Sequence, residues 1–104
     1  MIVREDLPPA HQLVQSAHAA HEAGIRYGNP DDISSLVVCS VADEAELRRA
    51  AADCLSRGIG HFLFFEEDLG GQATAFATEP ITGATRKAFK KFPLWSPARE
   101  ESVK

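Results

Sequence analysis

The sequence predicts an α/β fold, a three-layer sandwich with a mixed four-stranded sheet and the element order β-α-β-α-β-β-α. Residues 36–41 and 61–65 are almost continuously apolar and rich in β-branched or aromatic side chains, which is typical of strands buried on both faces. Segments with helical periodicity precede and separate these runs, so we expect the first three strands to pair in parallel through helical crossovers. Residues 66–71 indicate a polar connection, and the link over 68–71 is too short for a crossover, so the fourth strand should run antiparallel to its neighbours.

The first half of the chain is expected to form a strand at its start, a helix from about Pro9 to Ala23, and the strand over 36–41. Pro9 fits a first helical turn, where its missing N–H is not needed. At about 100° per residue, one broad side of this helix is apolar and should face the sheet; it consists of Leu13, Val14, Ala17, Ala20, Gly24 and Ile25. A polar stripe at one edge of that side is formed by His11, Gln15, His18 and Glu22. The residues 29–32 predict a turn.

In the second half, Asp43 and Glu46 have the spacing of a capping box at the start of a helix, which Gly58 should end. The inner stripe of this helix is predicted to be Leu47, Ala51, Cys54 and Leu55. Residues 72–78 alternate in polarity like a strand with one polar face. A last helix should begin after Thr82 and end at Pro93, with four residues pointing inward: Ala84, Ala88, Phe89 and Phe92. Residues 1–95 then form one domain, followed by a polar tail over 96–104.

The composition is that of a globular domain, but its charge is unevenly distributed. The chain has 104 residues, 44% of them hydrophobic, and a formal charge of −4, which argues against a general nucleic-acid binder. Residues 81–99 nevertheless contain basic and no acidic side chains, as in a solvated amphipathic helix or in a surface that meets a phosphate backbone. Cys39 and Cys54 lie in apolar patterns and are interpreted as reduced core residues. With neither a membrane-spanning run nor a signal-peptide pattern, we expect a cytoplasmic protein.

Two blocks of residues resemble a known enzyme family. The first is Arg4-x-Asp6-Leu7 followed by Gln15-x-x-His18-Ala19-Ala20. The second is Glu67-Asp68-Leu69-Gly70 followed by Thr74-Ala75-Phe76-Ala77-Thr78-Glu79-Pro80. In this order they resemble the type-2 (archaeal and eukaryotic) peptidyl-tRNA hydrolases over roughly residues 2–92. The resemblance implies the same α/β fold and cleavage of the ester between tRNA and a peptide or an N-blocked amino acid. His11 stands where that family has a lysine, and the 68–74 loop is shorter, so the chain resembles a divergent, bacterial branch.

The resemblance implies three catalytic residues. Asp68 matches the family's catalytic aspartate and would orient or deprotonate a water molecule; otherwise it caps a turn. Thr74 matches the active-site threonine and would position water or substrate; otherwise it is an ordinary strand threonine. His11 would replace the lysine with a side chain that titrates near neutrality; otherwise it is a surface residue of the first helical turn.

Candidate substrate-binding residues are Arg4, Gln15, His18, Lys87, Lys90 and Lys91. Gln15 and His18 match family positions that form the framework of the site. Arg4 either pairs with Asp6 to hold the strand end or contacts a phosphate. The three lysines would hold the acceptor stem of a tRNA, the expected partner.

No cofactor or metal is expected, and no membrane partner. His18-x-x-His21-Glu22 has neither zinc-protease order and lacks a third ligand cluster. The alternative to a hydrolase is a non-catalytic binding or dimerisation module on the same fold, because the lysine is lost, the loop is short and the net charge is acidic. A homodimer is left open by the sequence.

Overall fold

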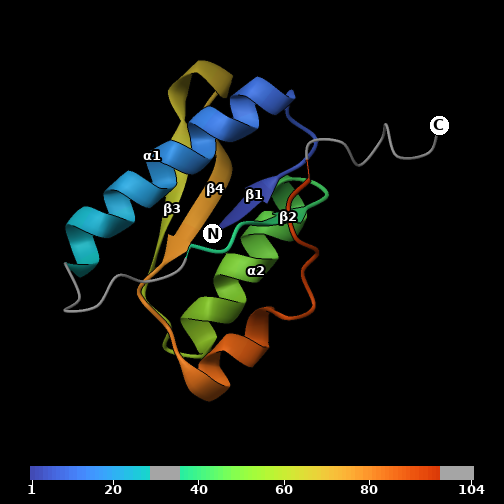
Figure 1. Ribbon diagram of the computed structural model, residues 1–104. Helices are drawn as coiled ribbons and strands as arrows, with labels where there is room; N and C mark the ends of the chain where they lie inside the picture. Colours follow the sequence, from blue (N-terminus) through green and yellow to red (C-terminus); the bar gives the residue numbers. More distant parts are fainter. Residues whose placement is uncertain (29–35, 97–104) are drawn as a thin grey trace.

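The computed structural model describes residues 1–28 and 36–96 and confirms the α/β class (Figure 1). Its strands are β1 (Ile2–Arg4), β2 (Cys39–Val41), β3 (His61–Glu66) and β4 (Gln72–Thr78). Its α-helices are α1 (Pro9–Tyr27) and α2 (Glu44–Ser56), and two 3-10 segments follow, η1 (Glu67–Leu69) and η2 (Gly83–Phe89). The turn expected over 29–32 and the tail after residue 96 lie outside the described residues.

The four strands form one mixed sheet in the order β2-β1-β4-β3. β1 pairs in parallel with β2, and β4 runs antiparallel to both β1 and β3, as the short 68–71 link predicted. The expectation that the first three strands pair directly was wrong for β3. Because β4 returns tightly against β3 and its other edge accepts β1, β3 has the direction of β1 but is separated from it by β4.

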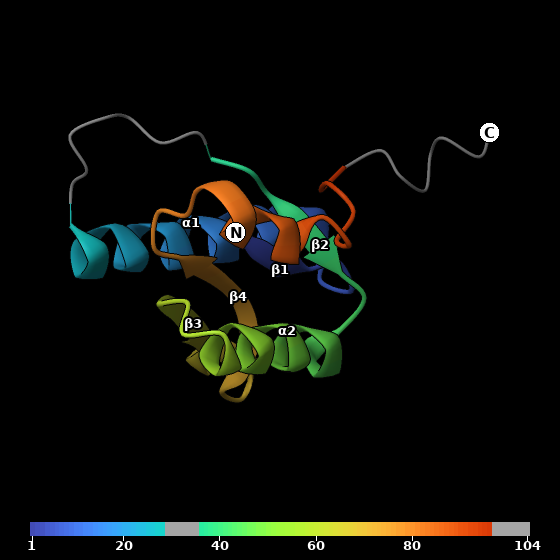
Figure 2. The ribbon, with the colours of Figure 1, turned by 90° about the horizontal axis from the view of Figure 1, so that it is seen from below.

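The two α-helices lie on opposite faces of this sheet and produce three layers (Figure 2). On the α2 face, Ile2, Leu47 and Phe76 belong to one hydrophobic cluster, in which each is no more than 1% exposed. On the α1 face, Val3, Ala19 and Ala75 belong to a second cluster. β1, β2 and β4 are therefore buried on both faces, so the polar face expected for residues 72–78 was wrong. The expectation that residues 61–65 are buried on both faces was also wrong, because β3 is an edge strand and is only partly buried.

The inward side of α1 differs from the prediction. The helix continues through Gly24 to Tyr27, and its buried residues are Gln12, Gln15, Ala19 and Ala23. The apolar side expected to face the sheet points to solvent instead, with Leu13 69% and Ile25 65% exposed. The reason is that Gln12 is fully engaged: its amide nitrogen donates to the carbonyls of Glu5 and Leu7, and its amide oxygen accepts from the Trp95 indole. A buried amide with all of its partners is tolerated in a core.

α2 follows the prediction closely. Asp43 caps it by accepting the backbone N–H of Glu46 at 3.0 Å, and Gly58 adopts φ 72° just after the helix. Leu47, Ala51 and Cys54 are buried as expected, whereas Leu55 is 75% exposed and Ala50 takes its place.

The two cysteines are free and buried. Burial raises the pKa of the Cys54 thiol to about 11, so this thiol is protonated at neutral pH. Burial also raises the pKa of Cys39. Both residues therefore behave as small apolar core residues, as the sequence predicted.

The last segment is a 3-10 helix rather than the predicted α-helix, and Ala84 is exposed. Phe89 and Phe92 do pack against the α2-side cluster. Residues 93–95 then cover the outer edge of β2. The Ser40 N–H donates to the Pro93 carbonyl and the Trp95 N–H donates to the Val38 carbonyl.

The contrast between Leu47 and Leu55 gives a test of this packing. Leu47→Ala should lower the free energy of unfolding by about 2–5 kcal/mol, because it empties a fully buried position. Leu55→Ala, the same change at an exposed position of α2, should lower the free energy of unfolding by less than about 0.5 kcal/mol. Urea unfolding of both variants measures this, and equal losses would contradict the orientation of α2.

Candidate functional site

A β-bulge at Thr74 is the centre of the candidate site. The pairing of β3 with β4 passes from Phe64–Ala75 to Phe65–Ala73, so Thr74 is the extra residue. A bulge of this kind turns consecutive side chains to the same face. Thr74 donates a hydrogen bond to the amide oxygen of Gln15 on α1 at 2.8 Å, while Ala75 belongs to the α1-side cluster.

Gln15 connects Thr74 to the end of β3. Its amide nitrogen donates to Glu66 Oε2 at 3.1 Å, while its oxygen accepts the Thr74 hydroxyl. The other oxygen of Glu66 accepts the backbone N–H of Asp68 at 3.3 Å. The Gln15 amide, the Asp68 N–H and the charge of His18 lower the pKa of Glu66. One carboxylate thus fixes the orientation of the Gln15 amide and anchors the turn that carries Asp68.

Arg4 approaches the bulge from β1. Its guanidinium forms a bidentate pair with Asp6, both distances 2.8 Å, and donates to the side chain of Gln72 and to the carbonyl of Ala73. Glu44, at the start of α2, accepts the backbone N–H of Ala73 at 2.8 Å. That bond is the main cause of the lowered pKa of Glu44. The bulge is therefore held by β1 and by both α-helices.

The three predicted catalytic residues lie at one end of the molecule. The β3–β4 turn and the first turns of α1 occupy this end, as Figure 1 shows. Asp68 is exposed in η1, and His11 is exposed one helical turn before Gln15. Thr74, in contrast, has 0% exposure. Asp68 and His11 can therefore meet water, whereas the Thr74 hydroxyl can act only through its neighbours.

His18 is exposed and stacks on Phe64, with ring centroids 4.7 Å apart and an interplanar angle of 5°. This contact covers the aromatic ring next to the bulge. Gln15 and His18 thus both make contacts beside the bulge, while their expected role as the framework of a hydrolase site stays a prediction. Arg4 likewise forms the predicted pair with Asp6, and its side chain is only 8% exposed.

The predicted tRNA-binding lysines are not brought together with these residues. They lie in and just after η2, the opposite end of the molecule from η1 in Figure 1. Lys91 approaches Asp53 of α2 at 3.9 Å and lies over the Phe92 ring. Lys87 and Lys90 are exposed. A tRNA that contacts both groups would have to extend along the molecule.

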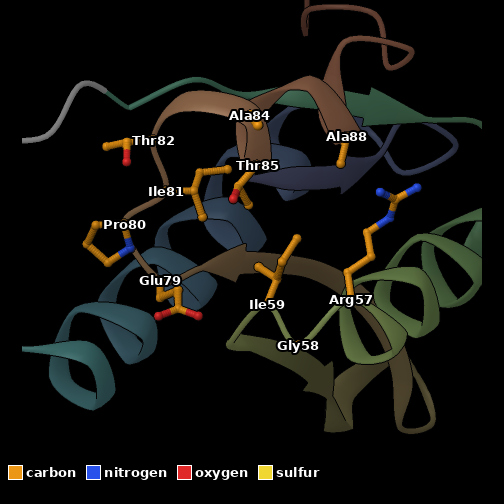
Figure 3. A pocket seen from close by; sticks show the side chains of 10 residues that line it. All are labelled: Arg57, Gly58, Ile59, Glu79, Pro80, Ile81, Thr82, Ala84, Thr85 and Ala88. Atoms are coloured by element: carbon orange, nitrogen blue, oxygen red, sulfur yellow. The ribbon is translucent and has the colours of Figure 1, made fainter.

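A surface pocket of about 610 Å³ lies near η2, between the end of α2 and residues 79–88 (Figure 3). Its lining includes Arg57, Glu79 and Thr85. The Glu79 carboxylate accepts the backbone N–H of Gly60, where a Cβ would collide with the Glu79 and Tyr27 side chains at 2.9 Å. A smaller pocket of about 380 Å³ lies beside Ser40 and Phe92. Neither pocket is lined by His11, Asp68 or Thr74.

Sequence reasoning missed Glu66 and Glu44, the two carboxylates that hold the bulge. Glu66 was assigned only to the polar 66–71 connection, and nothing in the sequence indicated its contact with Gln15, 51 positions away. Across residues 1–28 and 36–96, no group of three His, Cys, Asp or Glu residues is arranged to hold a metal ion. No α-helix in these same ranges is long and apolar enough to cross a membrane.

No protein-family model matches the sequence, and a search of curated proteins finds no significant match.

The Thr74 hydroxyl should contribute to stability. Thr74→Val keeps the shape of the side chain but leaves the buried Gln15 amide oxygen without its donor, so the free energy of unfolding should fall by about 1–3 kcal/mol. Thr78→Val at the far end of β4 is the control and should change it by less than about 0.5 kcal/mol. Chemical denaturation measures both, and a neutral Thr74→Val would contradict the bond.

The pKa of Glu66 should depend on Gln15. Because its pKa is lower in the folded than in the unfolded chain, ionised Glu66 stabilises the fold above the ordinary pKa of 4.5, and this stabilisation is lost as the pH falls through the folded-state value. In Gln15→Leu the pKa should rise toward 4.5, whereas Ser16→Ala, a neighbour on α1, should leave it unchanged. Carboxyl NMR titration measures the shift, and an unchanged pKa in Gln15→Leu would contradict the assigned contact.

Proposed function

We propose that this protein hydrolyses the ester between tRNA and a peptide or an N-blocked amino acid, as a divergent relative of the type-2 peptidyl-tRNA hydrolases. The observation that carries the proposal is the hydrogen bond between Thr74 and Gln15. These residues belong to the two separate blocks that resemble that family, and the bond joins them at one corner of the fold. Glu66 connects the same corner to the Asp68 turn.

In this proposal Asp68 orients or deprotonates the attacking water, because its carboxylate is exposed in a turn whose backbone is fixed. His11 acts as the nearby acid or cation for the ester oxygens. Thr74 is a positioning residue, since its buried hydroxyl contacts Gln15 rather than solvent. It holds Gln15, and through Gln15 the Glu66 carboxylate that anchors the turn.

The tRNA would contact the basic residues of the 86–91 segment through its phosphates, chiefly Lys87 and Lys90. Contact with phosphates suits these two lysines, which form no ion pair within the part of the chain that the structure describes, better than it suits Lys91, which approaches Asp53. The location that fits such a substrate is the cytoplasm.

The alternative is a non-catalytic binding or dimerisation module. The complete burial of Thr74 favours it, because the residue that matches an active-site threonine does not reach solvent. The two pockets away from His11 and Asp68 also favour it. Hydrolysis of an N-blocked aminoacyl-tRNA therefore distinguishes the two functions.

Asp68→Asn should abolish hydrolysis of N-acetylated aminoacyl-tRNA, with a loss of at least about 100-fold, because the amide cannot act as a base. Glu67→Gln, a similar change in the adjacent residue of η1, is the matched control and should retain activity. Release of the labelled N-acetylamino acid measures the rate, and circular dichroism checks the fold. Wild-type protein that leaves the ester intact, while a type-2 hydrolase cleaves it under the same conditions, would reject the hydrolase and leave the module.

A further inference from the structure

The solvent side of α1 is apolar along the whole helix. Seven exposed residues lie on it: Ala10, Leu13, Val14, Ala17, His21, Gly24 and Ile25. Among them only His21 is polar, and there is no Asp, Glu, Lys or Arg. Since 25% of the chain is charged, a 19-residue helix without one charge on its outer side is unusual. We call these seven residues the outer face of α1.

Outside α1, exposed apolar side chains such as Leu36 and Leu55 lie on separate segments, and the two edges of the sheet have cover. The edge of β2 is paired with residues 93–95. On β3, the guanidinium of Arg26 lies over the Phe62 ring at 4.5 Å, and that of Arg48 lies over the Phe65 ring at 5.3 Å. Cationic side chains over exposed aromatic rings protect such an edge from unwanted pairing. The outer face of α1 has no comparable charged side chain of its own.

Five of the seven residues of the outer face are arranged symmetrically about Ala17, whereas Val14 and Ile25 have no counterpart on it. Small residues occur at positions 10, 17 and 24, one every seven residues, and they define a line along which a second helix can approach closely. If an identical helix is placed antiparallel about a two-fold axis at Ala17, Ala10 of one copy faces Gly24 of the other. Leu13 then faces His21. Gly24 has nothing within 4 Å of the position of an added Cβ, so space for this approach exists.

The charges beside the outer face have the same symmetry. His11 and Glu22 lie on one flank of it, about 20° apart around the helix axis and eleven residues apart along it. The midpoint between them coincides with Ala17 to within half a residue. The two-fold arrangement that matches the small residues therefore also places His11 of each copy beside Glu22 of the partner copy, twice. A net charge of −4 on each chain would otherwise oppose association, and this uncharged face with two acid–histidine pairs reduces that repulsion.

We propose that the outer face of α1 binds a second copy of this chain, forming an antiparallel α1–α1 homodimer centred on Ala17. The proposal does not depend on the hydrolase activity: Asp68 and Thr74 take no part, and His11, which is also assigned to the proposed hydrolase site, only lies beside Glu22 of the partner copy. The paired α1 helices then form the middle of the dimer, with a sheet on either side of them and the α2 helices outermost. α1 is roughly 28 Å long at 1.5 Å per residue. One helix pair of this length buries on the order of 1,000 Å² in total, at the small end of specific interfaces, so we expect a dissociation constant in roughly the micromolar range.

Sedimentation equilibrium of the full chain tests the proposal. Wild type should approach twice the 11.3 kDa of the chain. Ala17→Glu places two carboxylates against each other at the axis and should weaken the dimer by roughly 100-fold. Ala52→Glu, on the exposed side of α2, adds the same charge to another helix and should leave the dimer intact. A wild type that remains monomeric at about 1 mM, or equal effects of the two variants, would overturn the proposal.

The antiparallel geometry has its own test. Ala17→Cys brings the two new thiols together at the axis, so mild oxidation should give a disulfide-linked dimer, while Ala52→Cys should stay unlinked. The native thiols do not interfere because both are buried. His11→Glu should weaken the dimer by repulsion from the partner's Glu22, and adding Glu22→Lys should restore it. A dimer that fails to cross-link through Ala17→Cys would contradict this interface. So would a dimer whose dissociation constant does not change with His11→Glu and its combination with Glu22→Lys.

Discussion

The β-bulge at Thr74 is the constraint on which the arrangement of the layers and of the candidate site depends. Without the extra residue, Thr74 would continue the alternation of β4 and face α2 rather than α1. With it, the Thr74 hydroxyl reaches Gln15 on α1, while the N–H of Ala73 reaches Glu44 on α2 and the Ala73 carbonyl reaches Arg4 on β1. Three elements from separate parts of the chain therefore bind to two adjacent residues, and their relative positions are fixed there.

Local patterns were sufficient for most of the fold. The cap at Asp43, the stop at Gly58 and the apolar strands are encoded over short distances, so the element order and the antiparallel direction of β4 could be predicted. The orientation of α1 could not, because hydropathy assigns glutamine to the surface. Gln12 and Gln15 are buried since distant groups satisfy their amides, Trp95 for one and Thr74 with Glu66 for the other. The position of β3 in the sheet could not be predicted either, because β4 inserts between β3 and β1. No local sequence pattern indicates that insertion.

The candidate site was predictable only where the family resemblance supplied positions. Gln15 and Thr74 came from separate blocks of that resemblance, and their contact spans 59 residues. Glu66 and Glu44 had no motif, because their importance comes from tertiary contacts with backbone and amide groups. A helix after Thr82 was predicted, but no local signal distinguished a 3-10 helix from an α-helix, so the basic residues there were expected on an α-helix. The resemblance led to Thr74, which lies at the bulge, but it did not indicate that this side chain is fully buried.

The sheet topology also constrains synthesis of the protein. The two inner strands come from opposite parts of the sequence: β1 begins at Ile2, and β4, which pairs with it, begins at Gln72. During translation β1 and β2 can meet early, but the central pair cannot close until most of the chain has left the ribosome. Until then the apolar β1 and β3 each lack an inner neighbour, which is a state prone to mispairing. The sheet of a nascent chain can therefore form completely only after β4 has emerged. If translation stalled before β4, the inner edges of β1 and β3 would stay unpaired.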